Sequence, residues 1–501
     1  MNLASLLDDH PGDRTAIVTG GERVSYGRLR DEIASMRGVL TSLGLEPGDR
    51  VAIMCGTNLR FVVAWLGAIG AGCVAVPLNP QSPAPEITRE LAIVGARAIV
   101  AGPAGIAPLV GVDRSTLPDL EFVLAPAGAQ LPDVLDVDAL VVEADPTPMV
   151  PREDGDLAAL LFTSGTAGEP KAAMLTHDNL ASNLRQVQAN PVRAARPDDV
   201  ALCVVPLFHV LGLNSILDLS LYAGATLVLV ERFDPSSMVE MIREEAVTLL
   251  VGPPTMWSAL TDLEDASPEA FQTVRLAVSG AAALPERVAE AAAAVLGVRL
   301  YEGYGLTEAS PSVTLGAGTD APIGSIGRPI AEIEMRIVDD NGDDGYIGDP
   351  GEIRVRGPNV FAGYWNDPEA TDRAVDAEGW LHTGDIAVVD DDGYLFLVDR
   401  AKDLIIVSGF NVYPAEVERV LVTHPAVAEA AVTGVAHPHS GEAVKAFVVT
   451  ESGTGVEEDE LIAWCASKLA RYKCPNKVDV VDELPHGLTG KVLRRELQDR
   501  A

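Results

Sequence analysis

The residue types most suited to chemistry lie in one loop, which follows an apolar run at residues 160–162. Its glycines let backbone N–H groups turn toward an anion, its hydroxyls can donate hydrogen bonds, and its lysine adds a positive charge. The pattern predicts a site that holds phosphate. The residues that would do so are Thr163, Ser164, Gly165, Thr166, Gly168 and Lys171.

This loop does not have the spacing of a Walker A motif, in which the lysine directly follows the second glycine and precedes Ser or Thr. Here Glu169 and Pro170 stand before Lys171, and Ala172 follows it. Taken alone, the loop also has a second interpretation, because clusters of Gly, Ser and Thr are commonly solvated turns.

Three later stretches combine further residue types that chemistry uses. Residues 278–284 place a Gly/Ala-rich turn after a strand-like run, where the backbone can approach a flat ligand closely. Residues 301–308 bring together an aromatic ring, a hydroxyl and a carboxylate. Residues 380–385 offer the carboxylate of Asp385 in a turn.

Two stretches with basic residues complete the set, at residues 399–414 and at residues 488–494 around Lys491. In this order along the chain, the motifs resemble those of the adenylate-forming superfamily, which comprises acyl-CoA synthetases, carrier-loading adenylation domains and beetle luciferases. The resemblance covers nearly the whole chain, and the wording of residues 399–414 is most similar to that of fatty-acyl-CoA ligases.

The resemblance implies an acid–thiol ligase that uses ATP, Mg²⁺ and coenzyme A. A small-molecule carboxylic acid would react with ATP to give acyl-AMP and pyrophosphate, and CoA would then displace AMP to give acyl-CoA. Two alternatives stay open: an acyl-AMP ligase that loads a carrier protein, and a catalytically silent ligand-binding relative.

The resemblance also implies roles for single residues around the nucleotide. The loop at residues 163–171 would wrap the β- and γ-phosphates of ATP. Tyr304 would stack on adenine beside Ser279, Gly280 and Ala281, because stacking and backbone contact suit a neutral flat base.

Four further residues would hold the rest of the nucleotide. Thr307 would contact the α-phosphate, and Glu308 would ligate Mg²⁺, a hard cation that prefers oxygen donors. Asp385 would accept hydrogen bonds from the ribose hydroxyls. Arg400 would support the ribose and phosphate from the side of the hinge.

Lys491 is the residue that the resemblance implies for the first half-reaction. An ammonium there would neutralise the charge between the attacking carboxylate and the α-phosphate. By its neighbours alone, a glycine and a basic run, Lys491 would be a solvated surface lysine. After adenylation the C-terminal domain would rotate about Lys402, and the loop of Ser408 and Gly409 would line the path of CoA.

The acid pocket is less closely specified. Residues 206–210 and 251–256 would border it, with His209 near its mouth as a further catalytic candidate; the alternative for His209 is a packed core histidine. Gly305 stands where acetate-type relatives carry a tryptophan, and a glycine there would leave depth for a longer chain. With apolar residues nearby, the expected acid is an aliphatic or aryl-alkyl acid of medium to long length, such as a fatty acid.

The sequence also departs from the superfamily pattern in two places. Ala167 replaces the usual second threonine of the phosphate loop, which removes one hydroxyl but no backbone donor. Residues 485–488 lack the arginine that relatives carry before the lysine, which puts a local ion contact in doubt.

The elements that must position these residues alternate between helix and strand. Short apolar runs between residues 15 and 279, separated by helical spacing, predict an α/β fold of layered parallel sheets with covering helices. After about residue 324, alternating strands and Asp/Gly turns predict a small antiparallel or barrel-like β subdomain.

Beyond that subdomain, helix and strand patterns predict a further α+β unit. We therefore expect an N-terminal adenylation domain at residues 1–399, which binds acid and ATP. A mobile C-terminal domain would follow at residues 400–501, with the hinge at residues 400–403.

Composition limits the function classes. The 501 residues carry a formal net charge of −36, which makes general binding to nucleic acid or to an anionic membrane unfavourable. The five cysteines are scattered without C-x-x-C spacing, so neither a disulfide framework nor a zinc site is indicated and a cytoplasmic location is expected. Monomer and homodimer both stay open.

One uncharged run, residues 61–78, has about the length of a membrane span. It contains three glycines and a proline, and its second half resembles a buried strand that follows a helix. The sequence therefore predicts no integral membrane segment.

Overall fold

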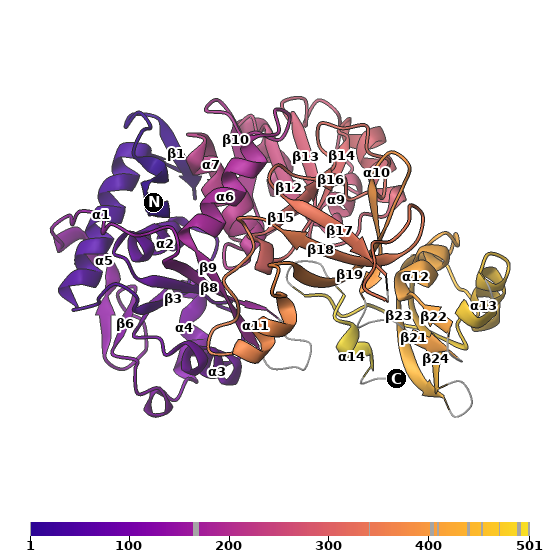
Figure 1. The fold of residues 1–501 in the computed structure, drawn as a ribbon. Helices are drawn as coiled ribbons and strands as arrows, with labels where there is room; N and C mark the ends of the chain where they lie inside the picture. Colours follow the sequence, from indigo (N-terminus) through magenta and orange to yellow (C-terminus); the bar gives the residue numbers. More distant parts are fainter. Residues whose placement is uncertain are drawn as a thin grey trace.

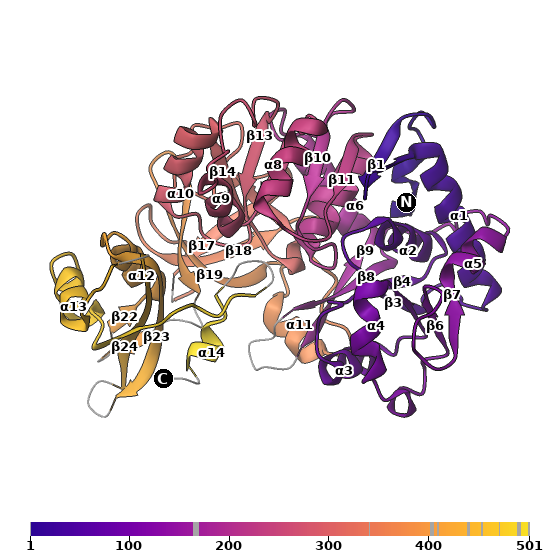
Figure 2. The same cartoon turned by 180° about the vertical axis from the view of Figure 1, so that it is seen from behind.

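The computed structural model describes residues 2–163, 170–339, 341–400, 405–407, 410–437, 441–451, 454–469, 471–487 and 492–498. Figure 1 shows a larger part, from β1 to β19, and a smaller part around β23 and β24, and Figure 2 shows the same arrangement from behind. This is the mixed α/β architecture, with a large N-terminal and a small C-terminal unit, that the sequence predicts. The boundaries 1–399 and 400–501 remain predictions.

The first sheet has seven strands, and all neighbouring pairs are parallel except the pair of β8 and β9. In spatial order they are β7 (Val134–Asp136), β6 (Phe122–Ala125), β5 (Ala98–Ala101), β3 (Arg50–Met54), β4 (Val74–Pro77), β8 (Leu157–Thr163) and β9 (Lys171–Thr176). The helices around this sheet are α1 (Tyr26–Ser42), α2 (Leu59–Gly70), α3 (Ala84–Val94), α4 (Pro103–Val110) and α5 (Val137–Glu143).

Strand β3 shows why the strands of this sheet are apolar along their whole length. Val51 and Ile53 belong to the core that contains α2, whereas Ala52 and Met54 belong to the core that contains α3 and α4. Both faces of a central parallel strand are covered, so polar residues cannot alternate with apolar residues along it.

The uncharged run at residues 61–78 is part of this core. It forms most of α2 and then β4, and the Asn58 side chain caps α2 by accepting a hydrogen bond from the Phe61 N–H. Among the described residues, no helix is both long and apolar enough to cross a membrane.

The second sheet has nine strands. In spatial order they are β16 (Arg328–Pro329), β15 (Ser312–Leu315), β14 (Leu300–Gly305), β13 (Leu276–Ser279), β12 (Leu249–Gly252), β10 (Val200–Cys203), β11 (Thr226–Leu229), β1 (Thr15–Thr19) and β2 (Glu22–Ser25). The strands from β14 to β1 are parallel, and β15, β16 and β2 are antiparallel additions at the two edges. Its helices are α6 (His177–Gln188), α7 (Leu219–Tyr222), α8 (Pro235–Glu244), α9 (Pro254–Thr261) and α10 (Glu286–Ala291), and a π-helix, η3 (Leu211–Asp218), precedes α7.

The predicted small β subdomain is a four-stranded antiparallel sheet with α11 (Pro368–Ala374) beside it. Its strands are β17 (Glu334–Val338), β18 (Gly351–Arg356), β19 (Leu381–Val389) and β20 (Leu395–Arg400). Asp385 therefore lies within β19 and not in a turn, which corrects the prediction. Gly384, with φ of +68°, interrupts the strand pattern directly before it, and the sequence pattern resembles a turn for that reason.

The smaller part has its own sheet and its own apolar core. The strands are β22 (Phe410–Val412), β21 (Ile405–Val407), β24 (Gly441–Thr450) and β23 (Val427–His437), and β25 (Lys477–Val480) pairs with β24. The helices are α12 (Pro414–Val422), α13 (Glu458–Ala466) and α14 (Arg494–Gln498).

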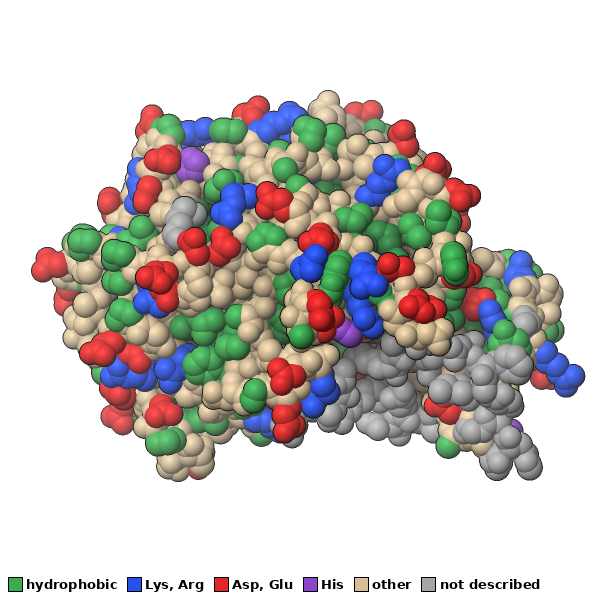
Figure 3. Space-filling model, viewed as in Figure 1, with side chains coloured by type: hydrophobic (Ala, Val, Ile, Leu, Met, Phe, Trp, Pro, Cys, Tyr) green, Lys and Arg blue, Asp and Glu red, His purple; other side chains and the backbone are tan. Residues whose placement is uncertain are grey.

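One face of the larger part carries charged side chains of both signs (Figure 3). Figure 3 shows acidic and basic side chains interspersed over one face of the larger part. On this face the charges of the two signs alternate without a broad basic area (Figure 3).

Candidate active site

A cavity of about 880 Å³ lies beyond the carboxyl ends of β8, β12, β13 and β14, and residues of β19 form another wall. This is the edge at which open α/β sheets bind ligands. Ten residues predicted for the site line it: Thr163, Lys171, His209, Ser279, Gly280, Ala281, Tyr304, Thr307, Glu308 and Asp385. The structure thus brings together side chains from motifs that are far apart in the sequence.

The remaining predicted residues lie outside the described residues: Ser164, Gly165, Thr166, Gly168, Lys402, Ser408, Gly409 and Lys491. Arg400 is described by its backbone, which pairs with Asp385 across β19 and β20. The described residues Gly487 and Leu493, on either side of Lys491 in the sequence, line the cavity.

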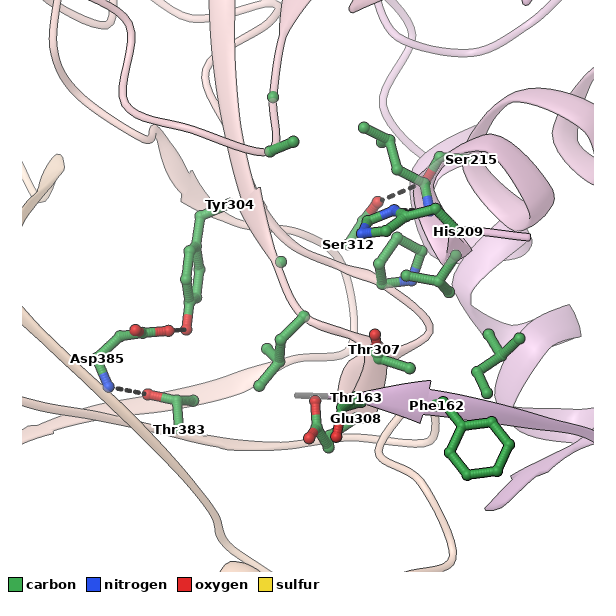
Figure 4. Close-up of a pocket in the computed structure, with 18 of the residues that line it drawn as sticks. Phe162, Thr163, His209, Ser215, Tyr304, Thr307, Glu308, Ser312, Thr383 and Asp385 are labelled. Atoms are coloured by element: carbon green, nitrogen blue, oxygen red, sulfur yellow. Dashed lines mark hydrogen bonds between the residues drawn. The ribbon is translucent and has the colours of Figure 1, made fainter. Parts of the chain in front are cut away.

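One wall of the cavity joins Tyr304 on β14 to Asp385 on β19. The Tyr304 hydroxyl donates a hydrogen bond of 2.6 Å to Oδ2 of Asp385, as Figure 4 shows. Asp385 is 6% exposed, and its backbone N–H donates to the Thr383 hydroxyl oxygen at 3.1 Å. The carboxylate is therefore held in one orientation beside an aromatic ring, an arrangement that suits a nucleoside.

A second wall centres on Glu308 in a short 3₁₀ turn, η5 (Thr307–Ala309). Tyr364 donates a hydrogen bond of 2.7 Å from its hydroxyl to Oε1 of Glu308. Burial and the charge of Glu308 raise the pKa of Tyr364, so this phenol stays protonated and remains a donor. The Lys171 ammonium lies 5.0 Å from the centroid of the Tyr364 ring. Tyr364 thus links two predicted phosphate-site residues, although no motif marks it.

The donor set around Glu308 suits a cation that takes most of its ligands from elsewhere. Among the described residues there is no group of three or more His, Cys, Asp or Glu side chains placed to hold a metal. Mg²⁺ is usually held by one or two carboxylates together with substrate phosphates and water. A single oriented carboxylate next to a phosphate loop meets that need.

The loop that joins β8 to β9 is fixed at both ends. Thr163 and Lys171 are paired opposite each other in the antiparallel ladder of β8 and β9. The pairing holds the lysine next to the start of the loop. The sequence did not indicate β9, because an antiparallel return strand is not expected beside a parallel sheet.

The far end of the cavity is formed by η3 and β15. His209 is half-buried on the cavity wall and not packed in the core, and its Nδ1 accepts a hydrogen bond of 3.3 Å from the Leu211 N–H. The hydroxyl oxygens of Ser215 and Ser312 lie 3.3 Å apart (Figure 4). Sequence reasoning missed both serines, and it missed Arg193, which also lines the cavity.

Gly305 lines the cavity, and the structure adds a backbone reason for a glycine at this position. A Cβ atom at this position would lie 2.1 Å from the carbonyl oxygen of Pro311. The close approach of β14 to the start of β15 therefore requires glycine by itself. The depth that this glycine would leave for a longer acid stays a prediction.

Comparison with known proteins agrees with this geometry. The sequence profile described as AMP-binding enzyme matches residues 6–365, and the profile described as AMP-binding enzyme C-terminal domain matches residues 416–491. A long-chain-fatty-acid–CoA ligase of Yersinia pestis is 37% identical over 97% of this chain and 92% of its own length. A feruloyl-CoA synthase of Amycolatopsis sp is 38% identical over 97% of this chain and 96% of its own length.

Among solved structures, that of ATP-bound MatB from Rhodopseudomonas palustris superposes with a TM-score of 0.91 at 32% identity, covering 100% of this chain and 98% of that chain. The class that the fold and the site define is that of the adenylate-forming CoA ligases. The chain belongs to the AMP-binding enzyme family. ATP and CoA are substrates of the CoA ligases of this family, and the acids in the names of the two relatives differ.

Proposed function

We propose that this protein converts a carboxylic acid of medium to long length, such as a fatty acid, into its CoA thioester through an acyl-AMP intermediate. The observation that carries the proposal is the order of groups along the cavity in Figure 4. Tyr304 and Asp385 lie at one side, His209, Ser215 and Ser312 at the other, and Thr307 and Glu308 between them. This spatial order suits a nucleoside at one side, the reacting phosphate in the middle and an acid at the other side.

At the nucleoside side, the Tyr304 ring would stack on adenine beside Ser279, Gly280 and Ala281, and Asp385 would accept from the ribose hydroxyls. Arg400, whose backbone pairs with that of Asp385, would support the ribose and phosphate. Thr163, Lys171 and the loop between them would hold the β- and γ-phosphates. Glu308, held by Tyr364, would ligate Mg²⁺, which would offset the negative charge of the phosphates.

In the first half-reaction an oxygen of the acid attacks the α-phosphorus. A new P–O bond to the acyl group forms, the bond to the pyrophosphate oxygen breaks, and pyrophosphate leaves with the electron pair. Thr307 would donate to an α-phosphate oxygen. Lys491 would place its ammonium between the carboxylate and that phosphate. Both contacts would reduce the repulsion between the carboxylate and the α-phosphate, two anions that must approach each other.

In the second half-reaction the sulfur of CoA attacks the acyl carbon, the thiol proton is lost, and AMP leaves with the former acid oxygen. We assign Lys402 to the hinge at residues 400–403, and Ser408 and Gly409 to the CoA path. His209 lies on the wall next to the acid and would contact its reacting end.

The test uses the full chain with ATP, Mg²⁺ and CoA and a ladder of straight-chain acids from acetate to stearate, with thioesters identified by mass. We expect acyl-CoA and AMP with a clear optimum in length, and loss of both in Lys491→Ala. Pyrophosphate release and acyl-AMP without thioester, for every acid, would contradict the CoA assignment and indicate a carrier protein as acceptor. Absence of pyrophosphate release with all acids would indicate a silent relative.

A further inference from the structure

A buried arginine lies at the acid end of the cavity. Arg193 is 5% exposed, and it lines both the main cavity and a smaller one behind it, as do Ser215 and Val251. One Nη atom donates a hydrogen bond of 3.2 Å to the Ser215 carbonyl oxygen. The guanidinium therefore stands at the inner wall, next to the two facing serine hydroxyls.

The charge of Arg193 is not matched by a carboxylate of its own. The nearest acidic side chain that influences it, Asp199, is occupied by Arg275 through hydrogen bonds of 2.8 and 2.5 Å and by the Thr248 hydroxyl at 2.7 Å. Within the described part of the chain, no carboxylate lies within ion-pair distance of Arg193. The two arginines and one aspartate thus leave one net positive charge in the protein interior.

Burial and the charge of Arg275 lower the pKa of Arg193 from 12.5 to about 10. The guanidinium is therefore still protonated at neutral pH. A buried cation without a counter-ion is costly, and a ligand that supplies an anion removes that cost. Arginine is also the side chain best suited to bind a carboxylate through two parallel hydrogen bonds.

We propose that the acid substrate is a dicarboxylic acid, whose second carboxylate is bound by Arg193 while the first reacts with ATP. This inference rests on the function proposed above. Apolar cavity walls from Leu211, Val251, Val278 and Leu315 contact the spacer between the two carboxylates. Of the Ser215 and Ser312 hydroxyls, which share a 3.3 Å hydrogen bond, one donates to the other and the second donates to an oxygen of the second carboxylate that Arg193 leaves unfilled.

The test compares dicarboxylic acids with monocarboxylic acids of the same number of carbons, each as kcat/KM for thioester formation. At the best length we expect the dicarboxylic acid to be favoured by at least about tenfold. Arg193→Met should lower kcat/KM for that acid by roughly 100-fold, because a charge-assisted contact in the interior is lost. The same variant should change kcat/KM for the matching monocarboxylic acid by less than about threefold.

The matched control is Arg373→Met. Arg373 also lines the cavity, but its side chain is 67% exposed and lies 3.9 Å from Glu369, so the preference should not change. A wild-type preference for monocarboxylic acids at every length would overturn the inference. Equal losses of kcat/KM for both acids in Arg193→Met would also overturn the inference. That result would mean that Arg193 only holds its own loop against η3. The comparison of dicarboxylic with monocarboxylic acids on the wild-type protein tests the inference even if Arg193→Met does not fold. Absence of thioester from every acid would instead contradict the proposed function.

Discussion

The Tyr304 hydroxyl and the Asp385 carboxylate are joined by a 2.6 Å hydrogen bond although they are 81 positions apart in the chain. The bond links β14 of the nine-stranded sheet to β19 of the four-stranded sheet. The nucleoside wall is therefore a junction between two sheets, and its geometry depends on both.

Tyr304→Phe removes this bond and keeps the ring. We expect KM for ATP to rise about five- to twentyfold, as for the loss of one hydrogen bond to a charged group, with kcat changed little. Pyrophosphate release as a function of ATP concentration measures it. Asp385→Asn is the comparison and should be affected more strongly, and an unchanged KM in Tyr304→Phe would show that Asp385 needs no such support.

Tyr364→Phe tests the second pair. Without the 2.7 Å hydrogen bond to Oε1, Glu308 is less firmly oriented. We expect the Mg²⁺ concentration for half-maximal activity to rise about three- to tenfold, because only the orientation of one ligand is lost. Titration of pyrophosphate release with Mg²⁺ measures it. If Glu308→Gln raises that concentration while Tyr364→Phe does not, the tyrosine has only a packing role.

Gly305→Ala should destabilise the protein whatever acid it uses. The new Cβ atom would lie 2.1 Å from the Pro311 carbonyl oxygen, and relief of that overlap costs roughly 1–3 kcal/mol. The melting temperature should fall by several degrees. Gly280→Ala is the matched control, because the nearest atom to its Cβ would be Leu211 Cδ2 at 3.7 Å. A normal melting temperature with selective loss of long acids would instead support a role of Gly305 in pocket depth.

Asp218 provides a prediction on pH. It is 0% exposed at the end of η3, its Oδ1 accepts from the Trp65 indole at 3.0 Å, and burial raises its pKa from 3.8 to about 8. Between these two values the unfolded chain has released the proton and the folded protein has not. The wild-type protein therefore loses stability through this group as pH rises from about 4 to about 8.

Asp218→Asn does not titrate at this position. The melting temperature of the variant minus that of the wild type should therefore rise from pH 4 to pH 8 and stay constant above pH 8. Thermal melts of the two proteins in parallel cancel the other titrating groups. A difference that is constant over the whole range would show that Asp218 is ionised in the folded protein.

Much of the fold could be predicted, because buried parallel strands appear in the sequence as short apolar runs. Helices appear as apolar residues at intervals of three and four. Residues 61–78, predicted as a helix followed by a buried strand, form most of α2 and then β4. Strand β9 was not predicted, because an antiparallel return strand is not expected beside a parallel sheet.

The site could be predicted where a motif carries it and not where tertiary packing does. Tyr304 and Asp385 stand in such motifs. Arg193 and Tyr364 do not, because a single arginine in a loop or a single tyrosine before a helix resembles any surface residue. Their places arise when the loop after α6 packs on η3, and when residues 361–365 bond to β9 and to Glu308.

Several residues at the acid end of the cavity come from one length of chain. Arg193, His209 and Ser215 belong to one continuous stretch, residues 190–218, whereas Tyr304 and Asp385 lie on later strands. Exchange of residues 190–218 for the corresponding stretch of a relative should therefore change the preference among acids while Tyr304 and Asp385 stay in place.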